Sequence, residues 1–134
     1  MATILQIFGA NTPLTVTGLA TLAAGATVVS DEIDNSGGHL TADIEIVSNN
    51  NGSADGTVNV YYMRANDAGE YPSVDVLDNL VFLMALNITA TIPKTNRRIE
   101  QLPEYFKIVV KNSNSAQALV DAAIEYQFAD LIND

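Results

Sequence analysis

A chain of 134 residues is the size of one domain, and its composition excludes several classes of function. It contains no cysteine, so a disulfide framework, a thiolate nucleophile and a sulfur-ligated metal are all excluded. With 16 acidic and 6 basic residues the net charge is -10, which predicts neither a nucleic-acid partner nor an anionic membrane partner.

The N-terminal segment shows no targeting signal. Residues 1–8 lack a basic n-region, and Gln6 interrupts their apolar run. The longest apolar stretch, residues 80–86, is far shorter than the roughly 18 residues that span a bilayer. We therefore expect a single domain over residues 1–134, in which residues 1–12 form an N-terminal arm or an edge strand.

Period-two alternation, the pattern of strands with one buried face, recurs along the first half of the chain. Short strands are predicted at residues 14–17 and 27–29, and longer ones at 40–46 and 57–63. Between the last two lies a segment of turn formers, residues 49–56. This order predicts an antiparallel pair joined by a surface loop. The residues predicted to point inward are Leu40, Ala42, Ile44, Ile46, Val58, Val60 and Tyr62.

The second half continues the pattern. Residues 80–90 begin apolar on both faces, which predicts a central strand, and residues 105–111 alternate with Phe106, Ile108 and Val110 inward. Residues 115–132 have the composition of a helix, and a helical stripe there (Val120, Ile124, Phe128 and Leu131) is almost as regular as the alternation from Ala118 to Phe128. We predict a strand, because the resemblance described below implies that this segment is the last strand. Short strands between Gly, Asn and Pro predict an all-β fold, a single antiparallel β-sandwich that is jelly-roll-like.

Residues that could carry catalysis are scarce. The one histidine, His39, follows Gly37 and Gly38 at a predicted turn with no recognisable nucleophile, so we expect it to be solvated and dispensable for stability. Two loops, residues 49–55 and 66–70, offer oxygen ligands but few carboxylates and no EF-hand spacing. The sequence predicts no enzyme, no cofactor and no metal site.

The alternative to a purely structural role is a carbohydrate-binding module. Sugar sites stack rings on exposed aromatic side chains, and Tyr61, Tyr62 and Tyr71 flank one predicted hairpin. The chain has no tryptophan, and one ring of each neighbouring pair can equally pack into the core.

The order of several segments resembles small jelly-roll or β-sandwich virion proteins of tailed phages, used for capsid decoration (cement) or as tail-associated parts. The resemblance is carried by residues 19–26, 29–36, 54–62, 66–69 and 106–113. It implies a decoration protein on the outer face of the head shell, made in the bacterial host cytoplasm, with a tail or neck position as the alternative. It also implies binding to the major capsid protein and a homotrimer at local threefold positions.

Basic residues are confined to one part of the chain, from Arg64 to Lys111. Three of them, Lys94, Arg97 and Arg98, fall in a connection between Pro93 and Pro103, which predicts a stiff basic loop. We expect these three to bind the partner through arginine–carboxylate contacts. The alternative is a solvated crossover between two sheets.

Overall fold

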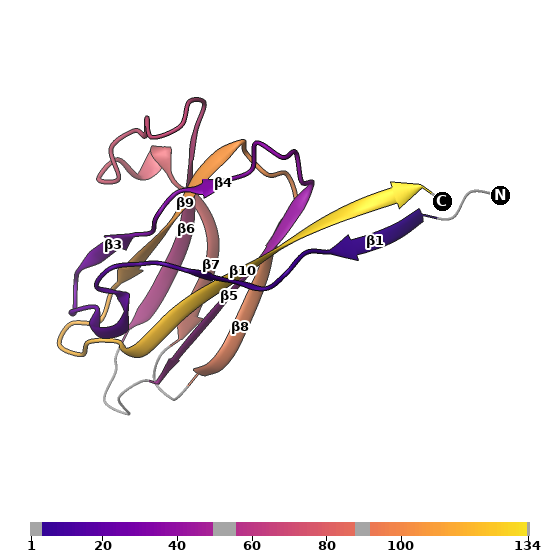
Figure 1. The fold of residues 1–134 in the computed structure, drawn as a ribbon. Helices are drawn as coiled ribbons and strands as arrows, with labels where there is room; N and C mark the ends of the chain where they lie inside the picture. The colour runs from indigo at the N-terminus through magenta and orange to yellow at the C-terminus, as the bar shows by residue number, and fades with distance from the viewer. Residues whose placement is uncertain (1–3, 50–55, 88–91, 134) are drawn as a thin grey trace.

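The computed structural model describes residues 4–49, 56–87 and 92–133, and it confirms the all-β prediction (Figure 1). Two antiparallel sheets pack face to face as a β-sandwich. The described residues form ten strands and two short 3₁₀ helices: β1 (Ile4–Phe8), β2 (Thr12–Leu14), η1 (Leu19–Thr21), β3 (Thr27–Val29), β4 (Ile33–Asp34), β5 (Thr41–Asn49), β6 (Thr57–Ala65), η2 (Leu77–Asn79), β7 (Val81–Asn87), β8 (Ile92–Ile99), β9 (Tyr105–Asn112) and β10 (Val120–Asn133).

The connectivity is that of a jelly roll. One sheet has the order β1-β10-β5-β8 with β2 also on β10, and the other has β3-β9-β6-β7 with β4 also on β9. The connections β5–β6, β7–β8 and β9–β10 therefore cross from one sheet to the other. The predicted pairing of residues 40–46 with 57–63 is wrong for this reason. Strands that face each other across a core alternate in the same way as hairpin partners, so the pattern could not separate the two cases.

The core lies between the sheets and is filled mainly by the residues that the alternation predicts. Full burial confirms these inward positions for three strands, with exposed fractions of 0%: Ala42, Ile44, Ile46, Val58, Val60, Phe106, Ile108 and Val110. Tyr62 is half-buried against the same cluster. Leu40 differs, because it lies just before β5 and is half exposed.

Strand β7 is an edge strand of its sheet, and the prediction of a central strand at residues 80–90 is wrong. The apolar residues at the start of β7 are therefore not explained by neighbouring strands on both sides. The connection from β6 to β7 folds over the outer face of the sheet, where Leu80 packs with Met63 and Val109 in a second small cluster. Val81 and Phe82 remain exposed beyond that cluster.

The strand predicted at residues 115–132 is confirmed as β10, which begins at Val120. A register shift between Val120 and Ala123, with Asp121 at φ 53°, interrupts its alternation. Before this bulge Leu119 is buried and Val120 is exposed, the reverse of the predicted phase. After it, Ala122 and Ile124 point into the core as predicted.

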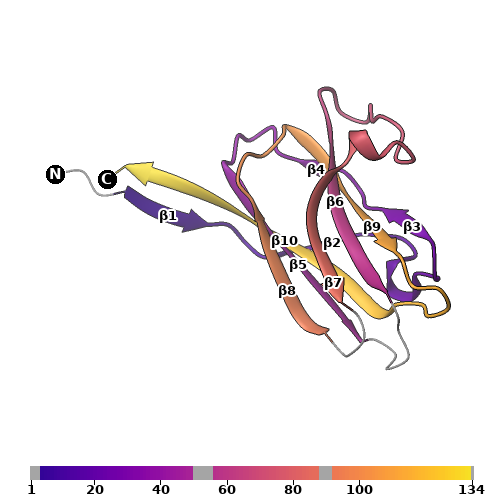
Figure 2. The same ribbon diagram turned by 180° about the vertical axis from the view of Figure 1, so that it is seen from behind.

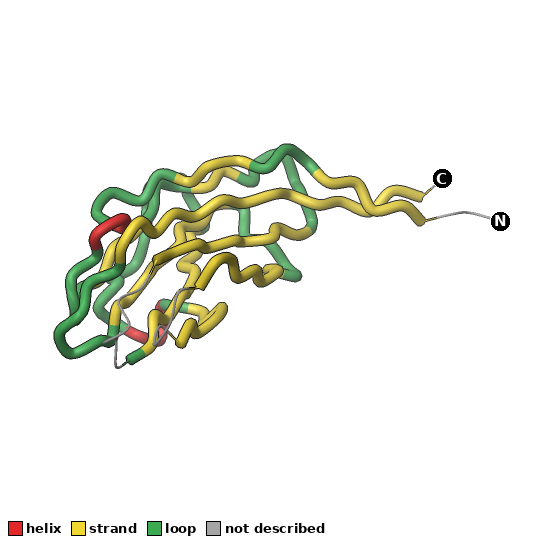
Figure 3. Tube along the Cα trace, turned by 90° about the horizontal axis from the view of Figure 1, so that it is seen from below, coloured by secondary structure: helices red, strands yellow, loops and turns green. Residues whose placement is uncertain are grey.

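The two ends of the chain form a ribbon that projects from the sandwich. β1 pairs antiparallel with the last part of β10, from Ile4 opposite Asn133 to Phe8 opposite Ala129. Figures 1 and 2 show this pair extending well beyond the body of the molecule, with both termini at its tip. Figure 3 shows the same projection from below. We call residues 4–8 and 129–133 the terminal ribbon.

Candidate functional site

A hydrogen-bonded histidine–aspartate pair lies where the terminal ribbon leaves the sandwich. His39 Nδ1 is 2.6 Å from Asp130 Oδ2, and the other oxygen of that carboxylate accepts the Leu40 backbone N–H at 3.0 Å. The imidazole stacks on Phe128, with ring centroids 4.4 Å apart. The expectation of a solvated His39 without an acid partner is therefore wrong, and its dispensability for stability stays to be measured. Its acid partner lies 91 residues away in sequence.

Backbone contacts complete the root of the ribbon. Gly9 N–H donates to the Phe128 carbonyl at 2.8 Å, and the Gln127 side-chain amide donates to the Gly9 carbonyl at 2.8 Å. Together with the His39–Asp130 pair these bonds fix the direction in which the ribbon projects. The pair has no described nucleophile bonded to it, and we assign it a positioning role.

We expect His39→Ala to lower the free energy of unfolding by about 1 kcal/mol, since an aromatic pair contributes roughly 0.5–1.5 kcal/mol beyond its buried area. Urea denaturation followed by tyrosine fluorescence measures the change. His39→Phe, which keeps the stacking on Phe128 and removes the hydrogen bond, separates the two contributions. An unchanged midpoint in His39→Ala would contradict this role.

The same pair predicts a pH dependence. The hydrogen bonds from His39 and the Leu40 N–H lower the pKa of Asp130 from its ordinary 3.8. A carboxyl whose folded-state pKa is lowered stabilises the fold above its unfolded pKa, and this contribution disappears as the pH falls through the folded value. Wild type should therefore melt above Asp130→Ala at pH 6, and the difference should shrink as the pH falls below 3.8, the ordinary pKa of the carboxyl. A difference that stays constant from pH 6 down through the acid range until the protein unfolds would argue against the ionised carboxylate.

The predicted basic loop is largely a strand. Residues 92–99 form β8, the edge strand beside β5, and only residues 100–104 connect it to β9. Pro93 is compatible with a strand at this position, because the outer side of an edge strand needs no backbone N–H donor. Arg98 Nε and Nη2 donate to the Asp43 carboxylate at 2.9 and 3.3 Å, which raises the pKa of Arg98. Arg97 is exposed, and the side chain of Lys94 lies outside the described residues.

Arg98 also links β8 to the terminal ribbon. Its guanidinium carbon is 6.0 Å from the centroid of the Phe8 ring, within the range of a cation–π contact. All three predicted partner-binding residues thus lie on β8, and Arg98 is close to the ribbon root. The structure does not test whether they bind a partner, and that stays a prediction.

Large exposed apolar side chains gather in two places. Ile7 and Phe8 of the ribbon, with exposed fractions of 47% and 50%, lie with Leu40 near the ribbon root. The second group, Val76, Leu77, Val81 and Phe82, follows η2 and β7, with Phe82 56% exposed. Phe82 lies beside Tyr61, whereas Val81 lies opposite Tyr62 on the other face of the sheet and lines a cleft there. Val120 is the remaining large apolar side chain that is exposed among the described residues. Contiguous exposed apolar surface marks interaction sites.

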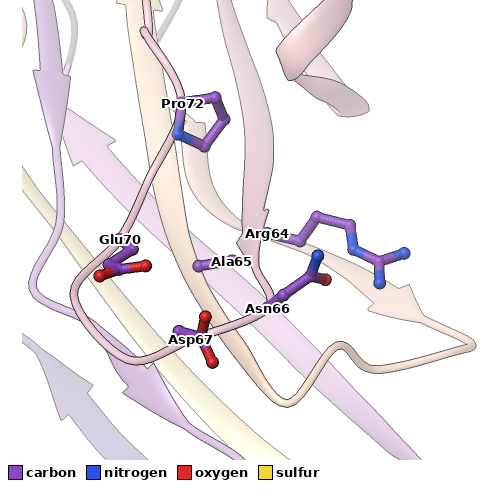
Figure 4. Close-up of a pocket in the computed structure, with 6 residues that line it drawn as sticks. All are labelled: Arg64, Ala65, Asn66, Asp67, Glu70 and Pro72. Carbon is purple, nitrogen blue, oxygen red and sulfur yellow. The ribbon is translucent and has the colours of Figure 1, made fainter.

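The loop after β6 surrounds an open hollow of about 510 Å³ (Figure 4). Its lining includes the carboxylates of Asp67 and Glu70 together with Arg64 and Asn66 from the end of β6. This is one of the two predicted oxygen-rich loops; the other, residues 49–55, lies almost entirely outside the described residues. No three His, Asp or Glu side chains gather as a metal site within the described residues.

Glu32 holds the loop in place. Its Oε2 accepts the Gly69 N–H at 2.7 Å and the Tyr71 hydroxyl at 2.9 Å. Burial, together with the nearby carboxylate, raises the pKa of Tyr71 well above its ordinary value. Because Tyr71 is committed to this bond and to Lys107, whose Nζ is 4.6 Å from the ring centroid, it is not a free stacking surface.

The other two tyrosines of the carbohydrate alternative point to opposite faces of their sheet. Tyr61 lies on the outer face, edge-to-face with Phe82 at 5.8 Å, and Lys111 Nζ is 5.7 Å from its ring. Tyr62 lines a cleft of about 320 Å³ at one end of the sandwich, with Arg64 and Gln101. The three tyrosines therefore form no common platform.

No protein-family model matches the chain, and no curated protein matches it by sequence. Solved structures to which it is similar include a rhamnosidase from Klebsiella oxytoca with rhamnose bound, at 14% identity and a TM-score of 0.48. The match covers 95% of this chain and 29% of the rhamnosidase. The chain thus spans less than a third of that enzyme's length.

Two further similar structures are carbohydrate-binding modules. One is a mannan-recognising module, TmCBM27, at 8% identity and a TM-score of 0.47, with 97% of this chain and 98% of that module covered. The other is a family 35 module from an environmental isolate, at 16% identity and a TM-score of 0.45, covering 98% and 92%. No helix within the described residues is long and apolar enough to cross a membrane.

Proposed function

We propose that this chain is a non-catalytic structural protein of a tailed-phage virion, a decoration protein that binds the outer face of the head shell as part of an oligomer. The observation that carries the proposal is the terminal ribbon, which extends past the sandwich (Figure 3). An isolated two-stranded ribbon is marginally stable in water. A projecting ribbon with exposed Ile7 and Phe8 gains stability from burial against another protein surface.

The rigidity of the ribbon root supports an assembly role. The His39–Asp130 pair and the Gly9 backbone bonds hold the ribbon in one direction before any partner is bound. Preorganisation of this kind lowers the entropic cost of association.

The distribution of charge supports β8 as the strand that contacts the shell. Residues 4–9 and 129–133 contain a single ionisable side chain, Asp130, so the ribbon contributes apolar and backbone contacts. Arg97 is exposed on β8, and Arg98 is oriented by Asp43 beside the ribbon root. These two arginines offer cations to an acidic shell from a body of net charge -10. Several β8 strands on one oligomer would bind the shell together, which raises the overall affinity above that of one weak contact.

The test is co-sedimentation with undecorated phage heads. We expect Arg97→Glu to weaken binding at least tenfold while leaving the oligomer intact, and wild-type binding to weaken as salt is raised. Arg64→Glu is the matched control, because it reverses an exposed arginine on β6, in the other sheet, and should bind as wild type. Equal binding by both variants would overturn the assignment to β8, and a wild-type protein that never co-sediments would favour a tail or neck position.

The carbohydrate-binding alternative is favoured by one observation, the cleft at Tyr62. Its volume of about 320 Å³ lies at the lower end of the range for small-ligand pockets. It combines an aromatic ring with the guanidinium of Arg64 and the amide of Gln101, groups that can contact a sugar ring and its hydroxyls. A glycan array tests it. Saturable binding that Tyr62→Ala abolishes and Tyr61→Ala leaves unchanged would place this function ahead of the structural one, and we expect a blank array.

A further inference from the structure

The cleft at Tyr62 lies where β6 ends, β7 begins and the connection between β8 and β9 crosses from one sheet to the other. Along β6, Val60 and Tyr62 face the core, and Arg64, one residue before the end of the strand, follows them on the same face (Figure 4). Val81 lies opposite Tyr62 in the register of β6 and β7. The other wall is made by the connection, with Gln101, Leu102 and Pro103. Three separate segments therefore line one cleft.

Hydrogen bonds fix the wall that the β8–β9 connection makes. The Leu102 N–H donates to the Leu40 carbonyl at 3.3 Å. The side-chain amide of Asn35, a residue that is 5% exposed, donates to the carbonyls of His39 and Pro103 at 3.0 and 3.3 Å. Sites for small ligands are usually formed largely in advance of binding. With its wall held in this way, the cleft of about 320 Å³ is a preformed site for a small molecule.

The polar side chains of the cleft are mainly hydrogen-bond donors. Arg64 brings a guanidinium, which only donates, Gln101 adds an amide and Tyr62 a hydroxyl. None of these three side chains forms a hydrogen bond or an ion pair with any residue that the structure describes. Arg64 also borders the hollow lined by Asp67 and Glu70, yet it pairs with neither carboxylate. The donors are thus available to a ligand that accepts hydrogen bonds.

The lining of the cleft holds one charged side chain, the cation of Arg64, although the chain as a whole is strongly acidic. Glu100 and Glu104 flank the connection in sequence, but neither lines the cleft. Most of the remaining lining is apolar: Val81, Leu102, Pro103 and the ring of Tyr62. A neutral sugar has hydroxyls all around its ring, and one amide and one hydroxyl would leave most of them without a side-chain partner. A ligand with one anionic group and an apolar body fits this lining better.

We infer that this cleft binds a small carboxylic acid with an apolar ring as its body. The carboxylate accepts two parallel N–H bonds from the Arg64 guanidinium, because the two planar groups match each other in geometry. The body of the ligand packs on the Tyr62 ring and on the apolar wall at Leu102. This activity goes beyond the proposed structural role and does not depend on it, since the proposed shell contact is on β8 in the other sheet.

The experiment is an NMR titration of the full chain with benzoate as the probe. We expect a Kd on the order of 1 mM for so small a ligand. Benzyl alcohol, which lacks the charge, and acetate, which lacks the ring, should each bind at least tenfold more weakly. Arg64→Gln should weaken benzoate binding at least tenfold, and Arg64→Lys, which keeps the charge but not the planar fork, should weaken it less.

Lys111→Gln is the matched control. It removes one positive charge from the outer face of the same sheet, where Lys111 Nζ is 5.7 Å from the centroid of the Tyr61 ring, and it should bind benzoate as wild type. Circular dichroism of each variant checks that the sandwich is folded.

A wild type that does not bind benzoate, or equal binding by wild type and Arg64→Gln, would overturn the inference. Titration with glucuronate, an acidic sugar, tests the apolar body: binding tighter than that of benzoate would overturn it in favour of the carbohydrate alternative. Co-sedimentation with heads gives a separate result. Heads bound by a wild type without benzoate affinity would overturn this inference alone, whereas benzoate binding by a protein that never binds heads would overturn the proposed decoration role alone.

Discussion

Replacing Asn112 by alanine is expected to lower the free energy of unfolding by about 3 kcal/mol, because several buried groups lose their partners at once. The Asn112 side chain is 1% exposed. Its Nδ2 donates to the carbonyls of Leu22 and Gln117, both at 3.0 Å. Its Oδ1 accepts two bonds from Asn114, the backbone N–H at 3.1 Å and Nδ2 at 2.8 Å. Alanine leaves these groups unsatisfied where water is excluded.

The comparison that isolates this effect is Asn66→Ala. Asn66 is exposed in the loop after β6, and its replacement should change the free energy of unfolding by less than about 0.5 kcal/mol. Urea denaturation of both variants at one protein concentration measures the difference. Near-identical midpoints would mean that water replaces the lost bonds, and the role given to Asn112 as the link between η1 and the β9–β10 connection would be wrong.

The strands themselves were predictable from the sequence because the signal is local. A strand with one face on a core needs an apolar residue at every second position, and β5, β6 and β9 show that pattern directly. The helix-like composition of β10 gave way to its alternation for the same reason. Burial of Ala122 and Ile124 stabilises the strand more than intrinsic propensity favours a helix.

The pairing of strands and the edges of the sheets could not be predicted, since they depend on contacts between distant residues. Pro93 and the neighbouring arginines indicated a loop, although the same residues suit an edge strand such as β8. The apolar start of β7 indicated burial on both faces, but a covering loop rather than a second layer buries Leu80.

In the candidate site, too, local features could be predicted from the sequence and contacts between distant residues could not. An N-terminal arm or edge strand was predictable from the apolar run near the start of the chain, and residues 4–8 lie in the terminal ribbon. The pair of His39 and Asp130 was hidden because 91 residues separate them and nothing in either local sequence points to the other. An acid flanked by apolar residues near the end of a strand was the one available signal.

The second large effect is expected for Phe106→Ala, which should lower the free energy of unfolding by about 4 kcal/mol. Phe106 lies on β9, between β6 and β4, opposite Arg64 and Ile33 in the two registers. Its exposed fraction is 0% in the core between the sheets. Removing the ring forfeits its burial and leaves a cavity that neighbouring strands, fixed by their hydrogen bonds, cannot fill.

Phe82→Ala is the matched comparison, since it makes the same chemical change at a ring that is 56% exposed. Both variants should be unfolded in urea at several protein concentrations, so that any contribution from self-association appears as a concentration dependence. We expect Phe82→Ala to cost less than about 1 kcal/mol, because an exposed ring loses little burial when it is removed. Equal destabilisation by both substitutions would contradict this expectation, since it would mean that the Phe82 ring is as buried in the folded protein as the Phe106 ring.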